Sequence, residues 1–176
     1  MTSANLKKTA ESKYSEKKYK EAALIFMDAA IIAGQENNIL EAAELKNNAS
    51  VAFLMAGDNL AAFDSALNTE KVFLSEGNLK NAGMSVGNQA AALEALGKNA
   101  QALEFYDKAA QLLDDAGDKE LKSYIQKRSS SIKLKQGRYL ESLASMDGAL
   151  QNSKVLSPKE KILKKLSGIV SKLIQR

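Results

Sequence analysis

Residues 97–118 read GKNAQALEFYDKAAQLLDDAGD and contain one complete unit of the pattern that decides the fold. A glycine stands near each end of the stretch, at Gly97 and Gly117. Between them, small or apolar residues recur at the three- and four-residue spacing that places them on one face of a helix. These residues are Ala102, Tyr106, Ala109 and Leu113. Since glycine just past a helix is a common left-handed stop, the stretch predicts an amphipathic helix closed at both ends.

Glycine recurs along the chain with a period of 40 residues. One series consists of Gly57, Gly97 and Gly137, with Lys17 one period earlier. A second series consists of Gly77 and Gly117, with Gly34 near the place of its first member. Two helix ends in each period predict a helical hairpin that is repeated four times.

The same small-then-large pattern follows the other members of the first glycine series. It consists of Ala22, Phe26 and Ala29, then Ala62, Ala66 and Thr69, and finally Ser142, Met146 and Ala149. One proline and 45% apolar residues are typical of a mostly helical chain with a continuous core. The expected helices are residues 3–16, 19–33, 38–56, 59–76, 79–96, 99–116, 119–136, 139–153 and 158–175.

These helices predict a single all-α domain of four hairpins and a C-terminal capping helix. The expected repeats are residues 1–36, 37–76, 77–116 and 117–156, followed by the capping helix at 157–176. The capping helix opens with Ser157-Pro158-Lys159-Glu160, a capping box with proline at the first helical position. Its apolar stripe is Ile162, Leu166, Ile169, Val170 and Leu173. A solenoid needs such an element to shield its last face.

The composition argues against an enzyme and against a cofactor or metal site. The chain has no cysteine and no histidine, which removes the commonest general base and the commonest transition-metal ligand. Its densest carboxylates are Asp114, Asp115 and Asp118, which we interpret as solvated surface and a helix cap. Without an apolar stretch of about 20 residues or a signal peptide, the expected location is the cytoplasm.

The second-helix pattern resembles the tetratricopeptide repeat (TPR) family, whose second helix carries alanine, an aromatic residue and alanine after a loop glycine. The likeness covers residues 3–152 and is strongest from Gly97 to Ala109. The 40-residue period is similar to that of Pins-type adaptors and, more loosely, of soluble NSF attachment proteins. In the first helices the family's small residue is present as Ala10, Ser50, Ala90 and Ser130. The resemblance implies a right-handed α-α superhelix that binds other proteins.

The resemblance also implies a peptide-binding groove lined by the first helix of each hairpin. Its slot for peptide-binding asparagines holds Lys8, Asn48, Asn88 and Arg128, and the preceding slot holds Lys7, Asn47, Gly87 and Lys127. An asparagine amide can bond to a peptide backbone, and the basic residues at each end could hold acidic groups. The alternative is that all eight are solvated or inter-helix positions.

Charge is unevenly distributed along the chain, which suggests a charged protein partner. Residues 1–20 sum to +4, residues 21–97 to −7 and residues 98–176 to +7. We therefore expect a non-enzymatic adaptor for a protein or peptide that could be acidic. A self-associating scaffold and a peptide-sensing regulator remain open alternatives.

Two further features have competing interpretations. The basic C-terminal helix favours a structural cap over a weak homodimer contact or a membrane contact, and the absence of base-stacking aromatic residues argues against nucleic acid. Gly83 and Gly87 stand one turn apart in an expected helix. They favour close helix packing, with a flat floor for a ligand as the alternative.

Overall fold

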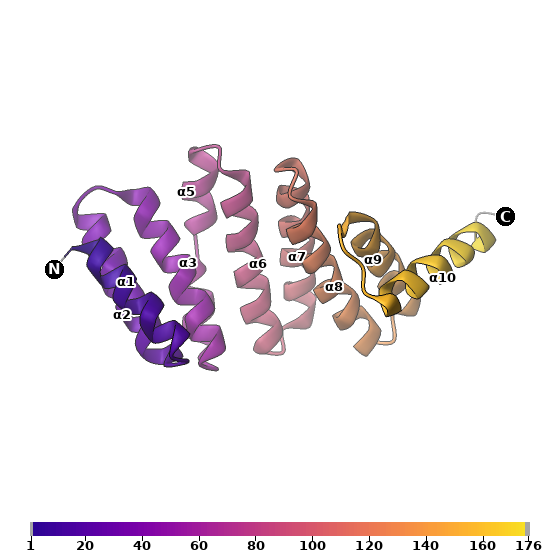
Figure 1. The fold of residues 1–176 in the computed structure, drawn as a ribbon, viewed down its shortest axis with the longest axis horizontal. Helices are drawn as coiled ribbons and strands as arrows, with labels where there is room; N and C mark the ends of the chain where they lie inside the picture. Colours follow the sequence, from indigo (N-terminus) through magenta and orange to yellow (C-terminus); the bar gives the residue numbers. More distant parts are fainter. Residues whose placement is uncertain (1, 175–176) are drawn as a thin grey trace.

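The described part of the chain is an array of stacked helical hairpins (Figure 1). The computed structural model describes the backbone of residues 2–174 and the side chains of residues 2–168. Within residues 2–174 there are ten α-helices and no strand. The helices are α1 Ser3–Ser15, α2 Tyr19–Gln35, α3 Ile39–Met55, α4 Asn59–Ala66, α5 Thr69–Ser75, α6 Leu79–Ala95, α7 Asn99–Asp115, α8 Lys119–Lys135, α9 Tyr139–Asn152 and α10 Pro158–Ile174. The predicted all-α superhelix is confirmed.

A left-handed residue ends nearly every helix, at intervals of 20 residues. These residues, all with positive φ, are Lys17, Asn37, Gly57, Gly77, Gly97, Gly117 and Gly137. Both predicted glycine series are therefore confirmed as helix stops. The prediction for Gly34 is wrong, because this residue lies inside α2 and Asn37 takes the stop position with a φ of 57°. Asparagine can replace glycine there because its short polar side chain tolerates this conformation.

The structure corrects the prediction of one helix over residues 59–76. α4 ends at Ala66 and α5 begins at Thr69, because Asn68 takes a left-handed φ of 64° between them. The break frees the Ala66 carbonyl oxygen, which buried side chains satisfy. It accepts hydrogen bonds from Thr69 Oγ1 at 2.8 Å, Gln89 Nε2 at 3.3 Å and Ser85 Oγ at 3.4 Å. The sequence signal for this break is the Asn68-Thr69 pair, because asparagine and threonine favour helix caps over helix interiors.

The core is built mainly from alanines that let the helices approach closely. The small residues predicted in the second helices, including Ala22, Ala62 and Ala102, are fully buried. Larger side chains such as Phe26 and Tyr106 fill the space between hairpins and are 4% and 1% exposed. Burying one side chain of this size contributes about 2 kcal/mol.

Gly83 and Gly87 are points of close helix packing, as predicted. A Cβ added at Gly83 would lie 2.8 Å from Leu113 Cγ, and one at Gly87 would lie 3.0 Å from Ile125 Cδ1. Leu113 belongs to α7 and Ile125 to α8. Gly83 therefore lets α7 approach α6 closely, and Gly87 leaves room for the Ile125 side chain of α8, which offsets their unfavourable helix propensity.

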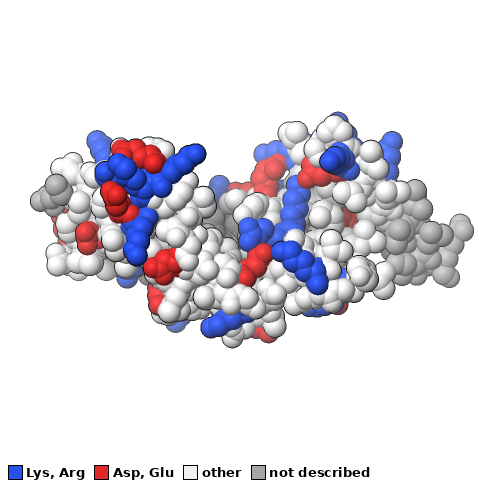
Figure 2. Space-filling view, turned by 90° about the horizontal axis from the view of Figure 1, so that it is seen from below, with Lys and Arg blue, Asp and Glu red and all other residues white. Residues whose placement is uncertain are grey.

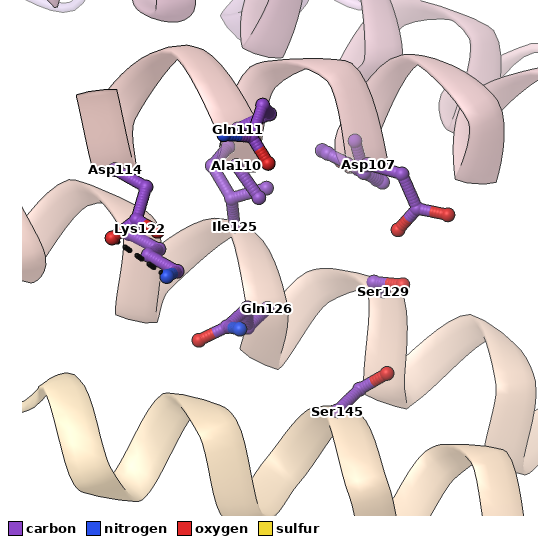
Figure 3. Close-up of a pocket in the computed structure, with 10 residues that line it drawn as sticks. Asp107, Ala110, Gln111, Asp114, Lys122, Ile125, Gln126, Ser129 and Ser145 are labelled. Atoms are coloured by element: carbon purple, nitrogen blue, oxygen red, sulfur yellow. Dashed lines mark ion pairs between the residues drawn. The ribbon is translucent and has the colours of Figure 1, made fainter. Parts of the chain in front are cut away.

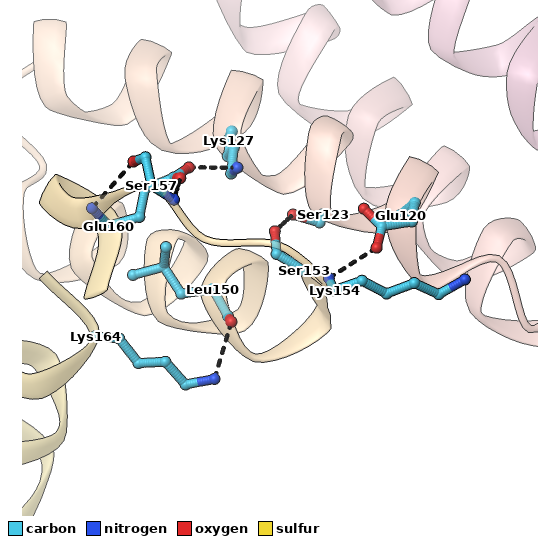
Figure 4. Close-up of polar contacts among 9 residues, drawn as sticks. All are labelled: Glu120, Ser123, Lys127, Leu150, Ser153, Lys154, Ser157, Glu160 and Lys164. Carbon is cyan, nitrogen blue, oxygen red and sulfur yellow. Dashed lines mark hydrogen bonds and ion pairs between the residues drawn. The ribbon is translucent and has the colours of Figure 1, made fainter.

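Polar contacts hold α10 to the end of the array (Figure 4). The predicted capping box is confirmed: Ser157 N donates to Glu160 Oε2 at 2.8 Å, and Glu160 N donates to Ser157 Oγ at 3.3 Å. Lys164 Nζ also donates to the Leu150 carbonyl oxygen at 3.0 Å. Of the predicted stripe, Ile162 and Leu166 are 61% and 54% exposed. The side chains of Ile169, Val170 and Leu173 lie outside the described residues.

Candidate functional site

The first helices of the hairpins form one face of the array. α1, α3, α6 and α8 lie on the side turned toward the viewer in Figure 1. Figure 2 shows the molecule from below, so that this side is its upper edge, and there the surface is hollowed between two raised parts. All eight predicted site residues belong to these four helices. We call this hollowed face the groove.

A cavity of about 340 Å³ opens where the first hairpin meets α3. Its lining consists of Glu11, Tyr14, Phe26, Asn48 and Val51. We call it the N-terminal cavity. The Tyr14 ring packs edge-on with the Tyr19 ring, with centroids 5.2 Å apart. The cavity therefore offers apolar walls, one amide and one carboxylate.

A hydrogen-bonded cluster of three side chains lies farther along the array. Tyr106 Oη donates to Glu94 Oε2 at 2.8 Å. Arg128 donates to the same oxygen from Nη2 at 2.7 Å and from Nε at 3.1 Å. We call these three residues the Glu94 cluster, and it ties α6, α7 and α8 together.

Ionisation in the Glu94 cluster follows from burial and from these bonds. Burial, and then the hydrogen bond to Glu94, raise the pKa of the Tyr106 hydroxyl far above its usual range. For Arg128, burial by itself would lower the pKa, but the hydrogen bonds to Glu94 and the electrostatic influence of Tyr106, Glu94 and Tyr124 together raise the pKa. Tyr106 is therefore a neutral donor and Arg128 a cation at any physiological pH.

The Glu94 cluster occupies the same slots of the repeat as three residues of the N-terminal cavity. Each pair of equivalent residues is 80 positions apart, which is two periods. The pairs are Tyr14 and Glu94, Phe26 and Tyr106, and Asn48 and Arg128. One structural position is thus an open cavity in the first hairpin and a filled polar cluster in the third.

The remaining predicted site residues fall into two groups. Three of them face the surface: Lys8 is exposed, and Lys7 and Asn88 are half-buried. The others contact the protein itself. Asn47 is buried and accepts from Thr69 Oγ1 at 3.4 Å, Gly87 packs under α8, and Lys127 Nζ donates to Glu160 Oε1 at 2.6 Å. The accessible part of the predicted ladder is therefore Lys7, Lys8, Asn48 and Asn88.

Sequence reasoning did not assign four residues that shape these sites, namely Glu11, Tyr14, Val51 and Glu94. For Tyr14 and Glu94, the sequence did offer a signal in the repeat position three residues before the left-handed stop of each first helix. That slot holds Tyr14, Leu54, Glu94 and Leu134. A carboxylate among apolar residues in one slot indicates a local polar partner, and Arg128 is that partner.

Two other kinds of site have no support within the described residues. No group of three or more acidic side chains there is arranged to hold a metal ion. No helix of residues 2–174 is long and apolar enough to cross a bilayer.

Comparison with known protein families gives a match over most of the chain. The family model described as "Soluble NSF attachment protein, SNAP" matches residues 2–155. No curated protein matches the chain. The matched range contains all four hairpins and stops just before α10, so it includes both the N-terminal cavity and the Glu94 cluster.

Proposed function

Because the chain belongs to the soluble NSF attachment protein family, we propose that it is a non-enzymatic adaptor whose groove binds a segment of another protein. The family consists of helical-repeat proteins that act through protein–protein interactions. In the proposed mode, which is that of TPR adaptors of the Pins type, an extended or helical segment lies along the first helices. We propose the cytoplasm as its location, in keeping with the family's description as soluble, and cell fractionation tests this.

The N-terminal cavity is the observation that carries this proposal. Its apolar walls, Tyr14, Phe26 and Val51, suit one apolar side chain of the bound segment. The Asn48 amide at its edge can bond to the segment's backbone, since it offers both donors and an acceptor. The ligand is therefore a peptide segment with an apolar anchor residue.

The predicted basic and polar residues extend this contact along the groove. Asn88 stands one period beyond Asn48 and is half-buried, so its amide is within reach of a longer segment. Lys7 and Lys8 on α1 suit acidic side chains next to the anchor. Lys127 and Arg128 would contact the ligand only by exchanging their bonds to Glu160 and Glu94.

Selection of peptides from a random displayed library tests the proposal. The selected peptides should share one apolar residue, and the double variant Asn48→Ala, Asn88→Ala should bind them at least about tenfold more weakly. Its melting temperature should stay near that of the wild type, because neither side chain is deeply buried.

The matched control is Gln101→Ala, which removes an exposed amide from α7, a second helix. This variant should bind the selected peptides as the wild type does. Equal affinity of the double variant and the control would reject the groove as the binding site.

A self-associating scaffold is a second candidate, favoured by the exposed apolar side chains of α10. Ile162, Leu163 and Leu166 are 61%, 41% and 54% exposed. A second copy packed on them would form a weak homodimer through this helix. Light scattering over a range of concentrations separates the candidates, since a strict monomer at high concentration excludes the scaffold.

A further inference from the structure

A second cavity lies at the junction of the third and fourth hairpins, outside the groove (Figure 3). It measures about 220 Å³ and is bordered by α7, α8 and α9. Its α8 wall includes Lys122, Gln126 and Ser129. At 3.6 residues per turn, these positions point away from the side of α8 that carries Arg128 into the Glu94 cluster. We call it the α7–α9 cavity.

Ser129 is an unmatched polar group in the wall of this cavity. The residue is 3% exposed. Its hydroxyl is the one buried side-chain polar atom of the described residues that has no hydrogen-bond partner. Leaving a buried hydroxyl unpaired lowers stability, and alanine at this position would avoid that loss. The serine is therefore explained better by a missing partner than by folding.

The charges around the cavity leave one carboxylate without an ion-pair partner in the described residues. Lys122 Nζ lies 2.8 Å from Asp114 Oδ1, so that these two charges neutralise each other. Asp107 makes no ion pair within residues 2–168. Asp107 interacts electrostatically with Arg138, but the Arg138 guanidinium pairs with Glu141 at 2.5 Å. Asp107 on the α7 wall is thus a lining carboxylate with no ion-pair partner in the described residues, while the Lys133 ammonium reaches the α9 wall at Ser145.

The other polar groups are already engaged but keep spare accepting capacity. Ser145 Oγ accepts from Lys133 Nζ at 2.9 Å, and Gln126 Oε1 accepts from Asn152 Nδ2 at 3.2 Å. Each of these oxygens has a second lone pair. The lining is therefore rich in acceptors, and several of them lie on different walls (Figure 3).

We propose that the α7–α9 cavity binds the guanidinium group of an arginine side chain on a protein partner. A guanidinium carries a positive charge for Asp107 and five donors in a planar fork, which suits acceptors on separate walls. The Ser129 hydroxyl accepts one of these donors and so gains its missing partner. The cavity shares Tyr106 with the Glu94 cluster, but its α8 residues Lys122, Gln126 and Ser129 lie on another side of that helix from Arg128.

The test uses Nα-acetyl-arginine amide as the probe with the full chain labelled with nitrogen-15. Titration should shift the backbone amide resonances of Asp107, Gln126 and Ser129 in a saturable way. Nα-acetyl-citrulline amide has nearly the same shape without the charge. It should bind at least about tenfold more weakly, because the charge-assisted hydrogen bonds are lost.

Two variants and one control locate the site. Asp107→Asn should weaken arginine binding about tenfold, because it removes the unpaired charge. Asp115→Asn, on the same helix and bonded to Gln111, should leave the affinity unchanged. Ser129→Ala should weaken binding while its melting temperature equals or exceeds that of the wild type, an outcome that a merely structural serine would not give.

Three results would overturn the proposal. The first is the absence of saturable shifts at the cavity residues. The second is equal affinity for the arginine and citrulline probes. The third is a lower melting temperature of Ser129→Ala, which would mean that the hydroxyl already has a partner in the free protein.

Discussion

The N-terminal cavity and the Glu94 cluster are one position of the repeat with opposite contents. In the first hairpin the slots hold Tyr14, Phe26 and Asn48, which enclose space between them. Two periods later the same slots hold Glu94, Tyr106 and Arg128, and both Tyr106 and Arg128 donate to Glu94. The backbone is equivalent in both places, so the side chains alone decide whether the groove is open. We therefore expect the groove to bind a ligand at repeats in which the residues of these slots do not bond to one another.

The Glu94 cluster is best understood as a joint between hairpins. It connects three successive helices through one carboxylate oxygen. A partly buried ion pair adds little net stability over an apolar contact, but removing one partner leaves the others unpaired in a poorly solvated place. The equivalent slots of the first hairpin form no such bond in the described residues, and its polar ties lie elsewhere, between Lys13 and Glu21 at 3.4 Å and from Ser3 to Glu41 of α3 at 3.2 Å.

The largest expected effect is that of Glu94→Ala, which breaks the joint. Arg128 and the Tyr106 hydroxyl would both lose their shared acceptor. We expect the free energy of unfolding to fall by about 2 kcal/mol, below the value for a fully buried pair because Arg128 keeps some solvent access. Urea unfolding followed by circular dichroism measures this.

The control for that experiment is Glu104→Ala, which removes an exposed carboxylate from α7. Its unfolding free energy should stay within about 0.5 kcal/mol of the wild type. If both variants were equally stable, the Glu94 cluster would be a surface contact, and its contrast with the N-terminal cavity would carry no energetic meaning.

A smaller effect is expected from copying the Glu94 cluster into the first hairpin. The triple variant Tyr14→Glu, Phe26→Tyr, Asn48→Arg should fill the N-terminal cavity with the same three-way contact. We expect the library-selected peptides to bind about tenfold more weakly, while the melting temperature changes by only a few degrees. Unaltered peptide affinity would show that the cavity is not where the anchor residue binds.

The fold was predictable from the sequence because its signals are local and periodic. Glycine stops and buried alanines recur every 40 residues, and each acts within its own helix or turn. The exceptions, Asn37 and the break at Asn68, depend on asparagine adopting the left-handed conformation that glycine adopts more readily. For Asn68, the donors that make the break tolerable come from α6 as well as from Thr69.

The contents of the groove were less predictable, because they depend on partners from other helices. Lys127 and Arg128 occupy predicted ligand-binding slots, but their carboxylate partners stand 33 and 34 residues away in sequence. The repeat shows which residues share a slot. It does not show whether a neighbouring helix brings a carboxylate within hydrogen-bonding distance. A basic side chain with such a carboxylate nearby forms an internal bond, and one without it is free to contact a ligand.

The smallest expected effect concerns Lys127, the neighbour of Arg128. Its partner Glu160 takes up a proton at low pH. Bonds from Lys127, and then from Ser157, lower the pKa of Glu160 from 4.5 to about 2. A carboxylate with a depressed native pKa stabilises the fold above its unfolded pKa, and this contribution is lost as pH falls through the native value. We therefore expect the first turn of α10 to loosen between about pH 4.5 and pH 2, with a modest effect because Glu160 is near the surface.

Carboxyl carbon NMR of Glu160 and hydrogen exchange at the Ser157 amide report this loosening. Glu160→Gln keeps an acceptor for the Ser157 amide but has no proton to gain, so its exchange rate should lose the extra pH dependence in this window. A Glu160 midpoint near 4.5 would mean that Lys127 is free in solution. At the C-terminal end of the groove, only the residues of the Glu94 cluster would then be held by bonds within the protein. Lys127 would be available to an acidic ligand, as the sequence predicts.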